Sequence, residues 1–296
     1  MTDPANDAPV WFIEAINRPH VAHISQACDC SIQWLEWGSR DRPTLLLLHG
    51  ILAHAGWWRA VAGLMCDDWH VVAPSWPGMG GSQWRERYSK DDYTATLIDF
   101  AIGSGLFEDG RRPVIAAHSF GAVVALGAVG LEARFGGLIM IDRAIEAEFN
   151  GDRIQPSAAR RHFATVAEAR ARYRLFPEEP APDFIIDQVV ADGLCAADGG
   201  GHYWRQDPML LRDIGSTPDL SQAFSAALCP VAFVRGDASE AFDAAREVRN
   251  RAITPSGTPH LVITRAGHHV PLQNPPALAV AIAILASKMI GSSTYD

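Results

Sequence analysis

Six short apolar runs, separated by segments of helical length, restrict the fold of this chain more than any other feature. Each run lacks the polar alternation of a half-exposed strand, and strands buried on both faces of a parallel sheet have this composition. The runs cover residues 44–48, 70–73, 113–117, 137–141, 230–234 and 260–264. Helices are expected after Trp57, Tyr93, Phe120, Asp243 and Pro275. The pattern predicts an α/β protein with helices on both faces of a mostly parallel sheet.

Two earlier runs, 21–27 and 31–37, are predicted to form an antiparallel pair, which brings the sheet to eight strands. By contrast, residues 144–227 show helical patterns, such as 166–173 and 183–192, and no convincing buried strand. This segment is interpreted as a helical cap domain inserted after the sixth strand. The core domain would then comprise residues 1–143 and 228–296. Such an insertion would cover the carboxyl ends of the strands, where ligands bind in open α/β sheets.

Charge and composition limit the kinds of partner and the cellular location that we expect for this chain. The chain of 296 residues has a formal net charge of −9, which argues against a basic surface for nucleic acid or anionic membrane and favours a small-molecule substrate. No basic and apolar leader is seen near the N-terminus, and the longest apolar stretch, 278–286, is too short to cross a membrane. The five scattered cysteines fit reduced thiols and a cytoplasmic location, and their spacing indicates no metal site. A homo-oligomer is compatible with the sequence.

The stretch 113–122 places a serine between a predicted strand and a predicted helix. Ser119 is flanked two residues away by Ala117 and Gly121, and larger residues there would clash across a sharp turn. Ala117 departs from the strict Gly-x-Ser-x-Gly pattern. The turn would expose the Ser119 hydroxyl and direct the N-terminus of the helix at developing negative charge. Ser119 is therefore the candidate nucleophile, and the alternative is a serine that only caps the helix.

A second strand ends at His49-Gly50. Gly50 would let the backbone turn so that the N–H of Ile51 and the N–H of Phe120 point at the same place. Two such donors form an oxyanion hole, in which each is worth roughly 3–4 kcal/mol in acyl transfer. We interpret His49, next to this turn, as a structural residue rather than a catalytic base.

The last predicted strand leads through Gly267 to a pair of histidines, His268 and His269, before the C-terminal helix. A base on this late loop suits a chain order of serine, acid and histidine. His268, directly after the glycine, is the candidate base, and His269 is the alternative. Two exposed loop histidines without a catalytic role would be the simpler interpretation.

Together these landmarks resemble the α/β-hydrolase fold family over nearly the whole chain. His49-Gly50, the glycine-rich turn 77–82, Ser119 and Gly267-His268 occur in the order typical of that family. The patterns at 203–208 and 234–240 are similar to those of a group of capped bacterial hydrolases. The resemblance implies a serine hydrolase that works through a catalytic triad and requires no cofactor.

The acid of the triad is the least certain member. The family places it either after the strand that follows the nucleophile, which here is Asp142, or after the next strand beyond the cap, at position 239. That second position is Ser239, flanked by Asp237 and Glu240. We prefer Asp142, with Glu240 and Asp237 as alternatives. The acid would hold the tautomer of the histidine and stabilise its imidazolium form.

These residues predict the hydrolysis of a carboxylic ester. A small or medium apolar acid is the expected substrate class, because no basic cluster is evident in the sequence. Trp57, Trp58 and Trp204 are candidates for lining the substrate pocket. A serine at position 119 excludes the family chemistries that need an aspartate nucleophile. Lactone hydrolysis and carbon–carbon bond cleavage of ring-fission diketones stay open, as does a member of the fold that only binds a ligand.

Overall fold

An eight-stranded sheet forms the centre of the computed structural model, which describes residues 8–146, 160–214 and 219–292. Its strand order is β1-β2-β4-β3-β5-β6-β10-β11, and all neighbours are parallel except the pairs β1–β2 and β2–β4. The strands are β1 (His20–Ala27), β2 (Cys30–Trp37), β3 (Thr44–Leu48), β4 (His70–Pro74), β5 (Val114–His118), β6 (Gly137–Ile141), β10 (Val231–Gly236) and β11 (His260–Ile263). The predicted α/β architecture with a mostly parallel eight-stranded sheet is confirmed.

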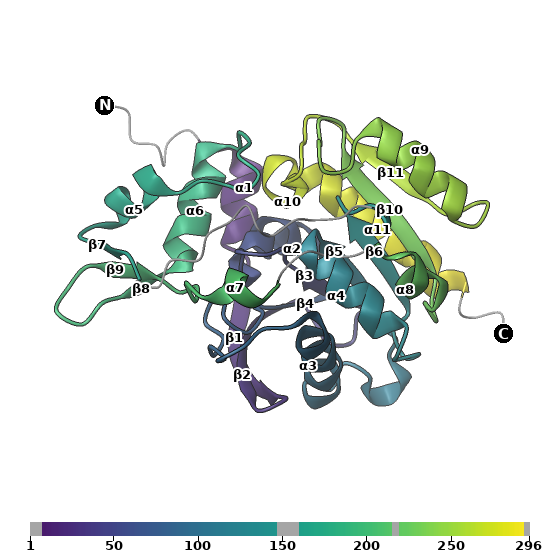
Figure 1. Ribbon diagram of the computed structural model, residues 1–296, viewed down its shortest axis with the longest axis horizontal. Coiled ribbons are helices and arrows are strands. Elements are labelled where there is room, and N and C mark those ends of the chain that lie inside the picture. The colour runs from purple at the N-terminus through teal and green to yellow at the C-terminus, as the bar shows by residue number, and fades with distance from the viewer. Residues whose placement is uncertain (1–7, 147–159, 215–218, 293–296) are drawn as a thin grey trace.

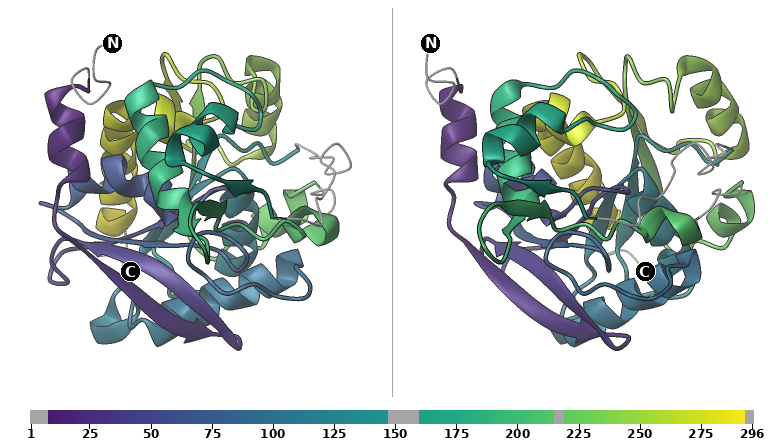
Figure 2. Two further views of the ribbon diagram at one scale, coloured as in Figure 1. Left: turned by 90° about the vertical axis from the view of Figure 1, so that its left-hand side faces the viewer. Right: turned by 60° about the vertical axis from the view of Figure 1, so that its left-hand side comes forward.

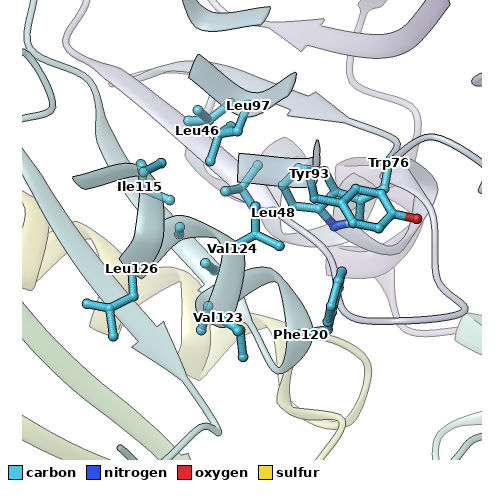
Figure 3. Packing of buried hydrophobic residues seen from close by; sticks show 14 of the residues in the cluster. Leu46, Leu48, Trp76, Tyr93, Leu97, Ile115, Phe120, Val123, Val124 and Leu126 are labelled. Atoms are coloured by element: carbon cyan, nitrogen blue, oxygen red, sulfur yellow. The ribbon is translucent and has the colours of Figure 1, made fainter. Parts of the chain in front are cut away.

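Helices cover both faces of the sheet (Figure 1). Side chains alternate along each strand, so Leu46 and Ile115 pack with α3 (Lys90–Gly103) and α4 (Phe120–Val129), whereas their neighbours Leu45 and Val114 pack with α2 (Arg59–Met65) and α11 (Pro275–Ser292). Figure 3 shows part of the first of these clusters, which includes Phe120. The helices of the core are α1 (Val10–Ile16), η2 (Ala55–Trp58), α2 (Arg59–Met65), α3 (Lys90–Gly103), η3 (Glu108–Gly110), α4 (Phe120–Val129), α9 (Ala244–Ile253), α10 (Val270–Gln273) and α11 (Pro275–Ser292).

The segment between β6 and β10 contains both helices and strands. It comprises β7 (His162–Phe163), α5 (Val166–Arg172), α6 (Asp183–Gly193), β8 (Leu194–Ala196), β9 (His202–Trp204), α7 (Leu210–Ile214) and α8 (Ser221–Ser225). The expectation of helices alone was incomplete, since β7, β9 and β8 form a small antiparallel sheet. Strands of two or three residues are too short to produce a periodic signal. Residues 147–159 and 215–218 of the predicted cap lie outside the described residues.

The N-terminal helix α1, which the sequence did not suggest, lies beside α6 of the inserted segment (Figure 2). The rings of Phe12 and Phe184 are 4.7 Å apart, and both belong to an apolar cluster that also contains Trp57. This cluster fixes the inserted segment to the core beside the ends of the central strands. In the described ranges, no helix combines the length and apolar character needed to span a bilayer.

Candidate active site

The nucleophile candidate lies at the junction between β5 and α4. Ser119 has φ 53° and ψ −116° and immediately precedes the helix. The turn requires Gly121, because a Cβ atom there would lie 2.6 Å from the carbonyl oxygen of His49 and 2.9 Å from that of Leu48. The small residue thus lets the start of α4 pack directly against the end of β3. Ser119 itself remains partly exposed.

Three of the seven non-glycine residues that have positive φ in the described part of the chain lie at neighbouring strand ends around this serine. Leu52, Ser119 and Asp142 all have positive φ angles, of 62°, 53° and 50°. They follow the carboxyl ends of β3, β5 and β6, three neighbouring strands at the centre of the sheet. A non-glycine residue in this region costs on the order of 1–3 kcal/mol and persists only when the surrounding structure enforces it. Three such residues at adjacent strand ends mark this edge of the sheet as the candidate functional site.

Ser119, His268 and Asp142 form one chain of hydrogen bonds. The Oγ of Ser119 lies 3.0 Å from Nε2 of His268, and Nδ1 of His268 lies 2.7 Å from Oδ2 of Asp142. Since a carboxylate can only accept, Nδ1 carries the proton and Nε2 is free to accept the proton of the serine hydroxyl. The arrangement can deprotonate Ser119 as the hydroxyl attacks an electrophile.

The carboxylate of Asp142 is buried, and three donors compensate for its lost hydration. Besides the His268 ring, the hydroxyl of Ser239 donates to Oδ2 at 2.6 Å, and the N–H of Gly236 donates to Oδ1 at 3.1 Å. Ser239, at the second position considered for the acid, therefore donates a hydrogen bond to Asp142. Such donors stabilise the charged form of a carboxylate.

Neither alternative acid contacts the histidine. Asp237 is exposed, and its carboxylate accepts the N–H of Ala266 at 3.2 Å, a bond that lowers the pKa of this carboxyl group. Glu240 is exposed as well, and the hydrogen bond at this residue runs from Arg246 to its backbone carbonyl. The structure thus brings Asp142 to His268, and it places Asp237 and Glu240 at the surface.

Two backbone amide groups near the serine are free to bind an oxyanion. The N–H groups of Ile51 and Phe120 have no acceptor among the residues that the structure describes. Gly50 lets the turn that carries Ile51 lie close to Ser119, because a Cβ atom at position 50 would lie 3.2 Å from Cβ of Ser119. The Phe120 ring packs edge-on against the Tyr93 ring, with 5.4 Å between the two ring centroids (Figure 3). The arrangement suits an oxyanion hole.

His49 has both ring nitrogens occupied by backbone groups. Its Nδ1–H donates to the carbonyl oxygen of Gly50 at 2.7 Å, and its Nε2 accepts the N–H of Trp76 at 3.1 Å. Burial lowers the pKa of His49 to about 3, so the ring is neutral. His49 therefore holds the turn that carries Ile51 and does not reach the serine.

The second loop histidine does not reach the serine. Nε2 of His269 donates to the carbonyl oxygen of Pro177 at 2.8 Å, and burial lowers the pKa of His269 to about 4.

A residue that sequence reasoning missed, His118, donates from Nε2 to the carbonyl oxygen of His268 at 2.8 Å. Its only signal in the sequence is a polar residue at the end of a buried strand. His118 thus holds the loop that carries the candidate base.

Glu179, also missed, holds the same loop from the inserted segment. Its two carboxylate oxygens accept the backbone N–H of His268 at 2.7 and 2.9 Å, and Nε2 of Gln273 donates to Oε2 at 3.1 Å. No motif surrounds Glu179, and it is 89 residues from its partner. The backbone of His268 is therefore held on both sides, by Glu179 at its N–H and by His118 at its carbonyl group.

A cavity of about 330 Å³ adjoins the site between the core and the inserted segment. Ile51 and two of the predicted tryptophans, Trp57 and Trp204, line it. Trp58 does not fit its predicted role, because it is fully buried in the cluster beneath α2. The described residues contain no group of three or more His, Cys, Asp or Glu side chains that could hold a metal ion.

Comparisons with known proteins agree with this architecture. A family model described as "Alpha/beta hydrolase family" matches residues 45–282. The 2-succinyl-6-hydroxy-2,4-cyclohexadiene-1-carboxylate synthase of Serratia proteamaculans is 26% identical over 263 residues, or 84% of this chain and 94% of that protein. The thioesterase domain from the curacin biosynthetic pathway superposes with a TM-score of 0.73 at 22% identity, covering 90% of this chain and 100% of that one. An esterase from Mycobacterium tuberculosis gives a TM-score of 0.70 at 21% identity, covering 92% of each chain.

Proposed function

The chain belongs to the alpha/beta hydrolase family, and from this premise we propose that it is a serine hydrolase that cleaves a carboxylic ester through an acyl-enzyme. Ser119 is the nucleophile, His268 the general base and Asp142 the acid that orients the base. The observation that carries the proposal is the continuous hydrogen-bond chain from Oγ of Ser119 through the His268 ring to Asp142, with distances of 3.0 and 2.7 Å.

Acylation begins when Oγ of Ser119 attacks the carbonyl carbon and its proton passes to Nε2 of His268. The carbonyl oxygen becomes an oxyanion, which the N–H groups of Ile51 and Phe120 stabilise. Asp142 stabilises the imidazolium and keeps the proton of Nδ1 in place. When the tetrahedral intermediate collapses, the bond to the leaving oxygen breaks, and that oxygen takes the proton from Nε2. The acyl group stays on Ser119.

Deacylation repeats these steps with water as the nucleophile. His268 accepts a proton from the water molecule, and the resulting oxygen attacks the acyl carbon. The second tetrahedral intermediate then breaks its bond to Oγ of Ser119, which regains a proton from His268. The carboxylic acid leaves, and the enzyme returns to its starting state.

Hydrolysis of p-nitrophenyl acetate and butyrate by the wild type, with Ser119→Ala as the matched variant, tests the proposal. We expect turnover by the wild type and a loss of at least about 10³-fold in Ser119→Ala, in line with the loss of a triad member. Labelling by a fluorophosphonate, which forms a covalent bond with an activated serine, tests the same residue without depending on the substrate. Equal rates or equal labelling in both proteins would refute Ser119 as the nucleophile.

The second candidate is cleavage of a lactone or of a carbon–carbon bond in a ring-fission diketone. One comparison favours keeping it, because the Serratia relative is named as the synthase of a cyclohexadiene carboxylate rather than as an esterase. Fluorophosphonate labelling without turnover of simple esters would support this candidate. Tight binding of a small molecule with neither labelling nor turnover would instead support a member of the fold that only binds a ligand.

A further inference from the structure

The cavity beside the candidate site has an unusual charge for this protein. Three arginines line it, Arg172, Arg174 and Arg205, all from the inserted segment. No aspartate or glutamate belongs to its lining, although the whole chain has a formal net charge of −9. Arg172 and Arg174 are two residues apart in the sequence, whereas Arg205 is about 30 residues further along the chain and joins them only in the folded protein.

Arg205 is the best placed of the three to bind a ligand. Its Nε donates to the carbonyl oxygen of Leu194 at 2.9 Å, which fixes the orientation of the half-buried guanidinium group. Among the described residues, its two terminal nitrogens have no acceptor, and no carboxylate lies within 4.0 Å of it. A guanidinium held in this way offers two parallel N–H donors, the geometry that matches a carboxylate.

The other two arginines are only weakly neutralised. Arg172 lies 3.6 Å from Glu168 and Arg174 lies 3.8 Å from Glu178, and both distances exceed that of a hydrogen bond. Exposed pairs of this kind are worth about 1 kcal/mol or less. Their positive charge therefore remains available to an anion that enters the cavity.

The remaining lining is neutral. His54 adds no charge, because its Nδ1 accepts the N–H of Gly56, its Nε2 donates to the carbonyl oxygen of Val189, and burial lowers its pKa. Trp57 and Trp204 supply apolar surface. The cavity thus combines aromatic side chains with a cluster of cations. Ile51, whose N–H is the proposed oxyanion donor, is also one of its lining residues.

We propose that the substrate of this enzyme carries a free carboxylate in addition to the bond that is cleaved, and that Arg205, assisted by Arg172 and Arg174, binds that carboxylate. This inference rests on the proposed function and narrows its substrate class from an apolar ester to the ester of a small dicarboxylic acid. A volume of about 330 Å³ is at the small end of ligand pockets, which fits such an acid.

The mono-p-nitrophenyl ester of adipic acid and its methyl ester test the inference, since the two differ in one charge and have nearly the same shape. We expect the wild type to prefer the free acid by about 10-fold or more in kcat/KM, the value of one hydrogen bond to a charged group. Arg205→Gln should reduce this ratio to below about 3. Arg134→Gln removes the same charge at the exposed pair with Glu132 and should leave the ratio unchanged.

The outcomes distinguish failure of the carboxylate site from failure of the serine hydrolase proposal. Turnover of the methyl ester without preference for the acid would overturn the carboxylate site and leave the serine hydrolase proposal intact. If neither ester is hydrolysed, calorimetric binding of adipate decides the inference without turnover. Binding that weakens at least 10-fold in Arg205→Gln, and with added salt, would support the site. No binding, or equal binding by both proteins, would overturn it.

Discussion

Glu179 offers the sharpest test of how the candidate base is held in place. Its carboxylate accepts the backbone N–H of His268 at 2.7 and 2.9 Å and the amide of Gln273 at 3.1 Å. A hydrogen bond to a charged group contributes about 1.5–3 kcal/mol. Glu179 is partly exposed, so water can replace part of this contribution in a variant and the lower end of the range applies. A loss of about 1.4 kcal/mol corresponds to a tenfold change in rate.

We therefore expect Glu179→Ala to lower kcat about 10-fold, and Glu179→Gln, which keeps one accepting oxygen, to lower it less. Glu178→Ala is the matched control. The Glu178 side chain, next to Glu179 in the sequence, is exposed, lies 3.8 Å from Arg174 and does not touch the His268 loop. It should change kcat less than twofold.

The assay is the second-order rate of Ser119 labelling by a small fluorophosphonate, measured beside kcat and KM for p-nitrophenyl butyrate. Labelling depends on activation of Ser119 by His268 and requires little of the substrate cavity, so it separates positioning of the base from substrate binding. If Glu179→Ala labels as fast as Glu178→Ala, or if only KM changes, Glu179 does not position His268.

Three further predictions follow from the geometry. Asp142→Asn should lower kcat by about 10⁴-fold because an amide favours the wrong tautomer of His268, whereas Glu240→Gln should retain most activity; the reverse ranking in steady-state assays would move the acid beyond β10. Ser239→Ala removes the 2.6 Å bond to Asp142 and should cost about 1–3 kcal/mol in unfolding free energy, which denaturant titration measures. The pKa of His49 falls to about 3 in the folded state, below its unfolded value of about 6.5, so unfolding free energy should fall by about 1.4 kcal/mol per unit as pH drops from 6.5 toward 3. A denaturation midpoint that does not change between pH 7 and pH 5 would contradict this last point.

The sequence predicts the sheet well because buried parallel strands are continuous apolar runs. The run 44–48 coincides with β3, and Gly137–Ile141 was placed correctly at both ends. The prediction was weaker where an element is short or gets its stability from distant contacts. Helix α1 has seven residues and packs on α2 and on Phe184, both distant in the sequence, and the strands of the inserted segment have two or three residues each. Local pattern carries little information about such elements.

The residues of the candidate site show the same difference between local motifs and distant contacts. Ser119, Ile51 and His268 lie beside glycines or strand ends, so a local motif marks each of them. Asp142 could be preferred but not fixed, because the choice depends on which strand end approaches the histidine. The roles of Glu179 and Arg205 could not be predicted from sequence, since each depends on a contact with a residue far along the chain or on a cavity that only the folded protein contains.

One short part of the inserted segment contacts both the arginine-lined cavity and the loop that carries His268. Residues 172–176 form a wall of the arginine-lined cavity, and Glu179, a few residues later, holds the backbone N–H of His268. If this part moved away from the core, the cavity would lose two of its three cations and the base would lose the acceptor of its amide. A substrate whose carboxylate binds Arg172 or Arg174 would stabilise the closed arrangement by its differential affinity for that arrangement. Substrate binding and positioning of His268 are therefore expected to favour the same conformation, and the inserted segment is expected to affect kcat as well as substrate preference.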